Sequence, residues 1–545
     1  MPARQGATSA NYTGEQPAAG TRNAQWPEGH PRRKQILLVL CLSLLAGVID
    51  NTVLNTALPT LARVMHAGTS SLQWMVDAYT LCFAALLIPA GALADRFGRR
   101  LSLICGLIVF ALGSLAAAFA PSAGALIADR VVMGFGAAFV MPATLSILNA
   151  VFPPRERPQA IAAWSAVAGV GIVIGPTLGG FLLSHFWWGS VFLVNVPIVV
   201  IALLGVLWCV PETAEAGHRS LDVLGTLLVG VALVALVDAI IEAPTRGWTG
   251  TVTIAEAATG LVALAAFVTW ELRIAQPLID LRVFSSRAFT AASGAVTITF
   301  FALFGSLFVF TQYLQLVHGY SPLSAGVRAL PFAFAMGAVS PISPLLAKRF
   351  GNRTVISAGL GLMGLGLVEL STAQVATGYP ALALAVAVMG LGMGLVMAPA
   401  SSTIMTTVPA HQASAGSAVN DTVREVGGSL GVAIVGSLTA ALYRDRLGSK
   451  LAAMHTPGLV VHVATGSIAA ADAVARSIGG ARGADLVTAA HASFTTAMAL
   501  GMRAAGAIAL ASAFGAIALI PRSRPAPMTQ AIPSEPELAV AASPA

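Results

Sequence analysis

Residues 91–100, Gly91-Ala-Leu-Ala-Asp95-Arg96-Phe-Gly98-Arg99-Arg100, form a short charged break between two long apolar runs. Gly98 permits a tight turn, and Asp95 can accept hydrogen bonds from neighbouring arginines or from a helix N-terminus. A related segment at 346–353, Leu-Ala-Lys-Arg-Phe-Gly-Asn-Arg, follows the second apolar run of the later half of the chain. The repetition indicates two equivalent halves. Lys348 occupies the position of Asp95, so we expect the two turns to differ in function.

Composition indicates a membrane protein. Hydrophobic residues make up 56% of the 545 residues, charged residues 10%, and the mean hydropathy is +0.81, a balance that a water-exposed surface could not tolerate. A hydrocarbon core about 30 Å thick requires about 20 apolar residues per helix. Runs of this length predict an all-α membrane protein with fourteen transmembrane helices. The predicted spans lie near residues 36–58, 74–94, 101–120, 125–151, 159–183, 189–210, 222–241, 252–270, 288–317, 324–346, 354–375, 379–406, 415–443 and 494–520.

The basic residues lie mostly in alternate short loops, and such loops are expected to be cytoplasmic. If the N-terminus is inside, the cytoplasmic loops and tails contain Arg96, Arg99, Arg100, Arg155, Arg157, Arg219, Arg273, Arg282, Arg287, Lys348, Arg349, Arg353, Arg522 and Arg524. The opposite short loops contain little more than Arg63 and Arg246. We therefore expect a multi-pass protein of the cell membrane with both termini cytoplasmic. The formal charge of +7 reflects this orientation and does not indicate nucleic-acid binding.

The spans divide as six, two and six. We predict a cytoplasmic N-terminal tail (1–35), a six-helix bundle (36–210), two inserted transmembrane helices with their loops (211–284), a second six-helix bundle (285–520) and a disordered cytoplasmic tail (521–545). A long outer segment, 444–493, lies within the second bundle. A floppy connection with some helix is the favoured interpretation of it, and a small external cap is the alternative.

Two motifs resemble the major facilitator superfamily, in which two six-helix halves enclose the transport site. Segment 91–100 is similar to the motif between its second and third helices, which implies a cytoplasmic latch with Asp95 against the start of the thirteenth helix. In the fifth helix, Gly171-Ile-Val-Ile-Gly175-Pro176-Thr-Leu-Gly179-Gly180 is similar to the family's antiporter motif. Its glycines are four residues apart and form one smooth face for close packing, while the proline favours a kink. The residues assigned to the latch are Gly91, Asp95, Arg96, Gly98, Arg99 and Arg100.

Three further segments resemble the fourteen-helix drug:proton antiporter branch of that family. They are 49–59 in the first helix, 74–81 in the second and 416–431 in the thirteenth. The resemblance covers residues 36–520, apart from the long outer segment. It implies a multidrug efflux transporter.

Asp50 in the first helix is the main candidate for proton coupling. A carboxylate at membrane depth costs about 2.5–3.5 kcal/mol on insertion scales, so it needs a partner or a role. A proton-coupled carrier requires a group that is neutral when sealed in one conformation and ionised when opened to the other side. The alternative is a structural hydrogen bond to Asn51, Asn55 or a backbone amide.

Arg130 and Asp77 are the other proton-coupling candidates. Arg130 resembles the arginine of the family's fourth-helix motif, which is linked to proton transfer, and we expect it to act electrostatically because it does not deprotonate. A pair with Asp129 or snorkelling is the alternative. Asp77 lies nearer the outer surface, and its position fits a simple placement at the membrane interface as well as it fits a role in proton coupling. Four other charged residues in or near apolar runs are second-rank candidates: Asp238, Glu369, Arg328 and Arg503.

These features predict a proton-driven exporter that moves lipophilic compounds, cations among them, by alternating access. Acidic and aromatic side chains suit a lipophilic cation through charge and ring-face attraction. The cavity candidates are Asn55, Trp74, Tyr79, Phe135, Trp164, Asn420 and Arg424. The alternative is export of a neutral or anionic antibiotic or metabolite. A non-transporting sensor or a membrane-embedded enzyme is disfavoured because the chain lacks catalytic motifs and the GxxxxGK[ST] phosphate loop. We expect a monomer whose partners are the lipid bilayer, a small-molecule substrate and protons, with no cofactor, metal or nucleic acid.

Overall fold

The computed structural model describes residue 26 and residues 28–213, 222–408 and 413–521. These residues form helices joined by short connections, without a strand among them, and fourteen of the helical segments are long and apolar enough to cross a membrane. The all-helical fold with fourteen spans is thus confirmed. Of the two predicted tails, residues 1–25 and 27 and residues 522–545 lie outside the described residues, and the first helix already begins at Arg33, within the predicted 1–35 tail.

The first bundle contains six spans. They are α1 (Arg33–Val64), α2 (Thr69–Phe97), α3 (Arg99–Ala118), α4 (Ala123–Val151), α5 (Arg157–His185), and α6 (Ser190–Leu193) continued by α7 (Asn195–Cys209). Next come the inserted helices α8 (Val223–Arg246) and α9 (Thr251–Glu271) and the 3-10 helix η1 (Leu281–Ser285).

The second bundle begins with α10 (Arg287–Gln312), which the π-helix η2 (Tyr313–Val317) extends. The remaining helices are α11 (Pro322–Arg328), α12 (Leu330–Val339), α13 (Ser343–Phe350), α14 (Asn352–Leu370), α15 (Tyr379–Thr407), α16 (Ala413–Ala453), α17 (Gly458–Ala464), α18 (Ile468–Ile478) and α19 (Gly480–Leu519). The predicted span at 324–346 is broken into α11, α12 and α13. Pro331 and Pro344 stand in the first turns of α12 and α13, where a missing N–H is tolerated.

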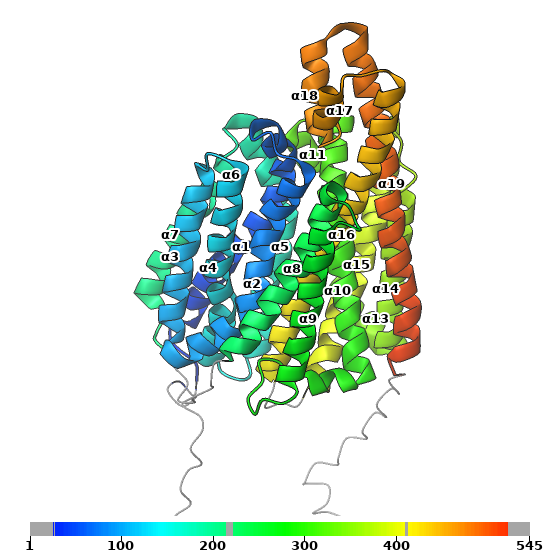
Figure 1. Cartoon of the computed structure of the whole chain (residues 1–545). Coiled ribbons are helices and arrows are strands. Elements are labelled where there is room, and N and C mark those ends of the chain that lie inside the picture. The colour runs from blue at the N-terminus through cyan, green and yellow to red at the C-terminus, as the bar shows by residue number, and fades with distance from the viewer. Residues whose placement is uncertain (1–25, 27, 214–221, 409–412, 522–545) are drawn as a thin grey trace, which may run out of the picture.

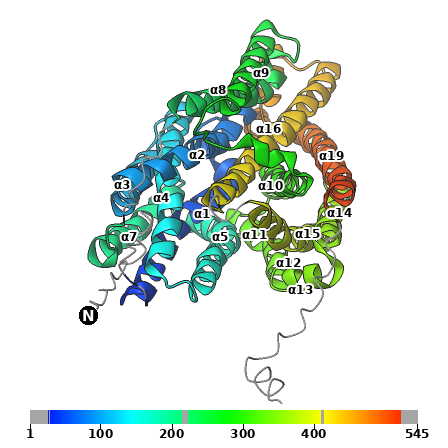
Figure 2. The same cartoon turned by 90° about the horizontal axis from the view of Figure 1, so that it is seen from below.

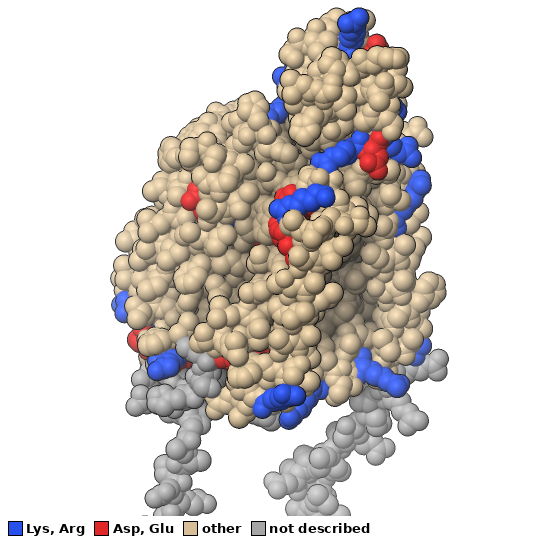
Figure 3. All heavy atoms as spheres, in the orientation of Figure 1, with Lys and Arg blue, Asp and Glu red and all other residues tan. Residues whose placement is uncertain are grey.

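The two bundles stand side by side, with α1 starting and α19 ending at the same end of the molecule (Figure 1). We call this end the terminal side. The opposite end is the cap side, because α17 and α18 project there (Figure 1). On the face shown in Figure 3, charged side chains gather at the lower edge and around the upper part, and the band between them is mostly uncharged. Such a band suits contact with lipid.

The inserted helices α8 and α9 lie on one side of the junction between the bundles, next to α2 and α16 (Figure 2). Val237 and Ile241 of α8 form a buried apolar cluster with Leu81 of α2 and Ala433 of α16. The insert therefore contacts both bundles and covers the seam between them on that side.

The outer segment 444–493 is largely helical, which differs from the favoured interpretation of a floppy connection. Helix α16 continues to Ala453, and α17 and α18 pack against its extension and against α19. The Tyr443 hydroxyl donates to the Ala464 carbonyl at 3.1 Å, and the Thr69 N–H at the start of α2 donates to the Gly466 carbonyl at 3.4 Å. The cap thus belongs to the second bundle and touches the first.

Candidate functional site

A cavity of about 1010 Å³ lies between the two bundles and is lined by residues of both. Most of its wall is apolar, with aromatic and methionine side chains; they include Tyr79, Phe83, Trp164, Phe300, Phe304 and Met393. Three charged residues of α16 also line it: Asp421, Arg424 and Glu425. A large apolar cavity with a few polar groups suits a drug-sized ligand.

A second cavity of about 940 Å³ lies toward the terminal side. It shares Met141, Trp164 and Asp421 with the central cavity, so the two are contiguous. Its wall is formed by the terminal-side halves of α2 and α4 and by the segment that joins α9 to η1. The central cavity therefore extends toward the terminal side.

The cap-side halves of the bundles are in direct contact. The Gln73 side chain of α2 donates to the carbonyls of Val432 and Ala433 in α16, both at 3.0 Å. The Gln315 side chain of η2 donates to the Thr56 carbonyl of α1 at 2.8 Å. These buried amide contacts close the cavity on the cap side.

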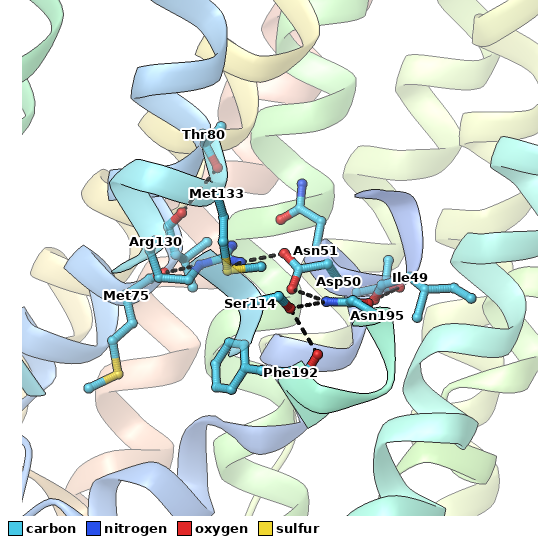
Figure 4. A network of polar contacts seen from close by, with 12 residues as sticks. Ile49, Asp50, Asn51, Met75, Thr80, Ser114, Arg130, Met133, Phe192 and Asn195 are labelled. Atoms are coloured by element: carbon cyan, nitrogen blue, oxygen red, sulfur yellow. Dashed lines mark hydrogen bonds and ion pairs between the residues drawn. The ribbon is translucent and has the colours of Figure 1, made fainter. Parts of the chain in front are cut away.

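Asp50 and Arg130 form an ion pair in the interior of the first bundle, and both side chains are fully buried (Figure 4). Asp50 accepts from Nη1 of Arg130 through Oδ2 and from the Asn195 amide at 2.9 Å through Oδ1. Nε of Arg130 also donates to the Met75 carbonyl at 3.0 Å. The structure thus pairs Arg130 with Asp50 of α1, and neither an Arg130–Asp129 pair nor snorkelling is seen. Asp50 bonds to groups from α4 and α7 and not to Asn51 or Asn55.

The network continues beyond the pair. The same Asn195 amide donates to the Ser114 hydroxyl at 3.1 Å, and Ser114 donates to the Phe192 carbonyl at 2.8 Å (Figure 4). Asp50 itself accepts a hydrogen bond at each carboxylate oxygen, one from Arg130 and one from Asn195. Nη2 of Arg130, in contrast, is buried without a hydrogen-bond partner among the described residues.

Tyr79 connects this network with the central cavity. Its ring lies 4.4 Å from the Arg130 guanidinium, and the same residue lines the cavity. Asn51, which follows Asp50, lines the cavity as well. Asp50 and Arg130 themselves lie behind the cavity wall.

Asp77 is fully buried, which differs from an interfacial placement. It lies on α2 one turn after Gln73 and faces Ser429 of α16, so it stands at the contact between the bundles. Neither of its carboxylate oxygens has a hydrogen-bond partner within bonding geometry among the described residues. A buried carboxyl without hydrogen-bond partners is costly and therefore a candidate for function.

The glycines of the fifth-helix motif allow α5 to pack tightly against two neighbours. A Cβ on Gly171 would lie 2.6 Å from Val48, one on Gly175 would overlap the Thr52 hydroxyl, and one on Gly179 would lie 3.0 Å from Val53, all on α1. Gly180 faces α11 of the second bundle, where a Cβ would lie 2.5 Å from the Leu323 backbone, and Gly326 packs on the Pro176 carbonyl. The motif therefore lies at a junction of the two bundles.

The 91–100 motif forms the expected tight turn. Gly98 has φ of 115°, and Gly351 in the related segment has φ of 84°, a region that favours glycine. Nε of Arg99 donates to Asp95 at 2.8 Å, and the Arg100 N–H donates to Glu212 at 3.1 Å. Residues 409–412, before the start of the thirteenth span, lie outside the described residues, so the contact expected for Asp95 there stays a prediction.

The cavity candidates divide into two groups. Tyr79, Trp164 and Arg424 line the central cavity. The other four do not, which corrects the prediction: Phe135 is 43% exposed on the outer face of α4, Trp74 packs on the α8 cluster, Asn55 bonds to the Asn51 carbonyl, and Asn420 accepts from Ser401. The rotation of each helix about its axis determines whether a side chain faces the cavity, and this rotation cannot be predicted from the residue types alone.

Several residues of the site were missed. Glu425 and Asp421 line the cavity, and their signal was present as two acids in the predicted thirteenth span. Asn195 and Ser114 complete the Asp50 network, but small polar residues in apolar runs are too common to single out.

Three of the second-rank charges have local partners of their own, and the fourth, Glu369, is exposed. Arg246 binds Asp238 at 3.2 Å, the Arg328 guanidinium lies 4.0 Å from the Tyr320 ring, and Nε of Arg503 donates to Ser371 at 3.4 Å. None of the four lines the central cavity.

Comparison with known proteins agrees with this geometry. Residues 40–432 match the sequence model of the Major Facilitator Superfamily. The chain is 37% identical over 412 residues to "Multidrug resistance protein Stp" of Mycobacterium tuberculosis, covering 75% of this chain and 76% of that protein. It is 33% identical over 511 residues to "Tetracenomycin C resistance and export protein" of Streptomyces glaucescens, covering 93% of each.

A solved structure has the same fold. It is a bacterial homologue of the human lysosomal transporter Spinster in an inward-facing conformation, with a TM-score of 0.65 at 18% identity, covering 90% of this chain and 97% of that one.

Proposed function

The chain belongs to the Major Facilitator Superfamily, and on that premise we propose that it is a proton-driven exporter of lipophilic compounds, cations among them. It is a multi-pass membrane transporter and not an enzyme. Its relatives include proteins named for drug resistance and export, which supports a drug exporter. The observation that supports proton coupling is the buried Asp50–Arg130 pair beside the cavity.

The pair has the properties that a proton-coupling site requires. Breaking a buried ion pair is costly unless the free charge is neutralised, so release of Arg130 requires a proton on Asp50. The unpartnered Nη2 of Arg130 and the Tyr79 ring beside it offer an alternative setting for the cation. Protonation of Asp50 would therefore weaken the link between α1 and α4 and change how these helices pack beside the cavity. Asp77, neutral when buried at the contact of α2 with α16, would ionise when that contact opens.

The cavity wall supports a lipophilic substrate. Rings of Tyr79, Trp164 and Phe300 offer flat contact surfaces, and the Glu425 carboxyl group lines the same wall without an ion-pair partner among the described residues. Arg424, in contrast, is paired with Asp421 at 3.4 Å. A bound cation would be attracted by Glu425 and by the ring faces.

We assign the terminal side to the cytoplasm because the basic short loops lie there. The cavity would then open to the cytoplasm, from which an exporter loads. Moving one charge through about 150 mV supplies about 3.5 kcal/mol, enough for a gradient of a few hundredfold per proton.

Everted membrane vesicles test the proposal. We expect energised vesicles containing the protein to accumulate a fluorescent lipophilic cation, and addition of the cation to release protons from their lumen. Dissipation of the proton gradient should stop uptake. Flux that continues without a gradient would exclude antiport, and transport of a neutral antibiotic alone would favour the alternative substrate class.

A further inference from the structure

The inserted helices place two carboxyl groups side by side in the wall of the terminal-side cavity. Asp222 precedes α8, and Glu271 is the last residue of α9. Both are more than nine-tenths buried, and both line the cavity of about 940 Å³. Neither residue takes part in the hydrogen-bond network of Asp50, which lies inside the first bundle.

Each carboxyl has one oxygen with hydrogen-bond partners. Oδ1 of Asp222 accepts from the Gly225 N–H and from the Trp270 indole N–H, both at 2.9 Å. Oε2 of Glu271 accepts from the Ile279 N–H at 3.1 Å. The two residues thereby join the start of α8, the end of α9 and the connection to the second bundle.

The other two oxygens face each other. Oδ2 of Asp222 and Oε1 of Glu271 are buried without a hydrogen-bond donor among the described residues. Both lie within 2.6 Å of the position that a Cβ on Gly225 would occupy, and the glycine leaves room for them. As two carboxylates they would be unsatisfied acceptors of like charge in contact, whereas one proton between them satisfies both oxygens.

Among the described residues, no cation is paired with either of these two oxygens. Asp222 is the charged neighbour of Glu271. The cavity wall also contains Asp95, Asp280, Asp421 and Arg282, so its lining has five acidic residues and one arginine. Asp95 is paired with Arg99 and Asp421 with Arg424, while Asp280 caps the Arg282 N–H at 3.1 Å.

We propose that Asp222 and Glu271 form a proton-binding site on the terminal side, in which one proton shared between Oδ2 and Oε1 holds the start of α8 to the end of α9, where the connection that leads into α10 begins. Loss of the proton leaves two adjacent negative charges, which repel and push the end of α9, with the 272–286 connection that follows it, away from the start of α8. Because this connection is the covalent link to the second bundle, the site gives the cavity entrance a dependence on pH. The inference does not require that export be proton-coupled.

Infrared titration of the purified chain, without substrate or gradient, tests the shared proton. Between about pH 5 and about pH 9 we expect the wild type to lose one protonated-carboxyl band that both Asp222→Asn and Glu271→Gln lack. In each variant the new amide N–H donates to the remaining carboxylate and replaces the proton, so folding should be retained. Asp280→Asn, a carboxyl of the same cavity wall, is the matched control and should keep the band.

Trypsin digestion tests the consequence, because Arg273 and Arg282 in the connection are exposed. Cleavage there should accelerate severalfold with rising pH in the wild type, relative to cleavage elsewhere, but not in the two amide variants. An identical infrared titration in the wild type and both variants would overturn the site. If either single variant fails to fold, the Asp222→Asn/Glu271→Gln double variant replaces it, because its two amides can bond to each other. Its infrared titration is then compared with that of the wild type in the same way. If the infrared titration shows the shared proton but the vesicles show no proton-coupled transport, the antiport proposal fails and the proton-binding site of Asp222 and Glu271 stands.

Discussion

The Asp50 carboxylate of α1 and the Arg130 guanidinium of α4 form a fully buried ion pair, and the Tyr79 ring contacts both the guanidinium and the central cavity. Tyr79 therefore links the pair to the wall of the central cavity. In the proposed mechanism, substrate and proton do not need to occupy the same atoms. A ligand that displaces the Tyr79 ring would alter the setting of Arg130, and protonation of Asp50 would alter the cavity wall.

Asp50→Asn should abolish proton-coupled efflux while the protein still reaches the membrane, because the amide cannot exchange a proton but can still accept from Asn195. Loss of the charge also leaves Arg130 unpaired, which costs ~3–5 kcal/mol of stability for a buried pair. Efflux and proton release in vesicles measure the first effect, and thermal unfolding in detergent the second. Asp129→Asn, at the neighbouring position on α4, is the control. Unchanged efflux in Asp50→Asn would remove Asp50 from the coupling mechanism.

Glu425→Gln should weaken export of lipophilic cations at least tenfold and leave export of neutral compounds nearly unchanged. Glu425 lines the cavity, and its charge would be the main attraction for a cation there. Paired efflux assays with a cationic dye and a neutral antibiotic give the ratio. Glu256→Gln, on α9 and outside the cavity lining, serves for comparison. Equal losses for both substrates would indicate a structural role for Glu425.

Gly175→Val should destabilise the protein and slow transport, because its Cβ would overlap the Thr52 hydroxyl on α1. Overpacking of this kind costs ~1–3 kcal/mol, and separation of α1 from α5 would also disturb the adjoining contact of Gly180 with α11. The melting temperature and the efflux rate should both fall. Gly169→Ala lies on the same helix with no atom within 4 Å of its Cβ, so it should leave the melting temperature unchanged. Equal effects of the two substitutions would contradict the packing explanation.

Cysteines at Thr69 and Gly466, in a background without native cysteines, should become cross-linked and stop transport. The Thr69 N–H donates to the Gly466 carbonyl at 3.4 Å, so the cap touches the first bundle when the cap side is closed. Opening toward the cap side must separate them. Efflux should return after reduction, and each single cysteine variant should transport normally. Full activity of the cross-linked protein would mean that the cap moves with the first bundle.

Much of this protein's architecture follows from its sequence. Apolar runs of membrane length are a property of local composition, so the fourteen spans could be counted without tertiary information. Gly98 and Gly351 marked two turns that do require positive φ, and the glycines of α5 marked a packing face. Asp50 could be singled out because a charge within an apolar run is costly, and Arg130 because its segment resembles the family's fourth-helix motif.

Which charges meet was decided by tertiary structure alone. Asp50 and Arg130 are 80 positions apart, and only the packing of α1 against α4 makes them partners. Hydropathy records that a residue lies in a helix but not which way the helix is rotated, so Phe135 was assigned to the cavity although it faces outward. For the same reason the facing carboxyls of Asp222 and Glu271, at the two ends of the insert, became visible only when α8 and α9 were folded against each other. The sequence determined that this chain spans the membrane fourteen times, and the packing of those helices determined which of its buried charges lie together.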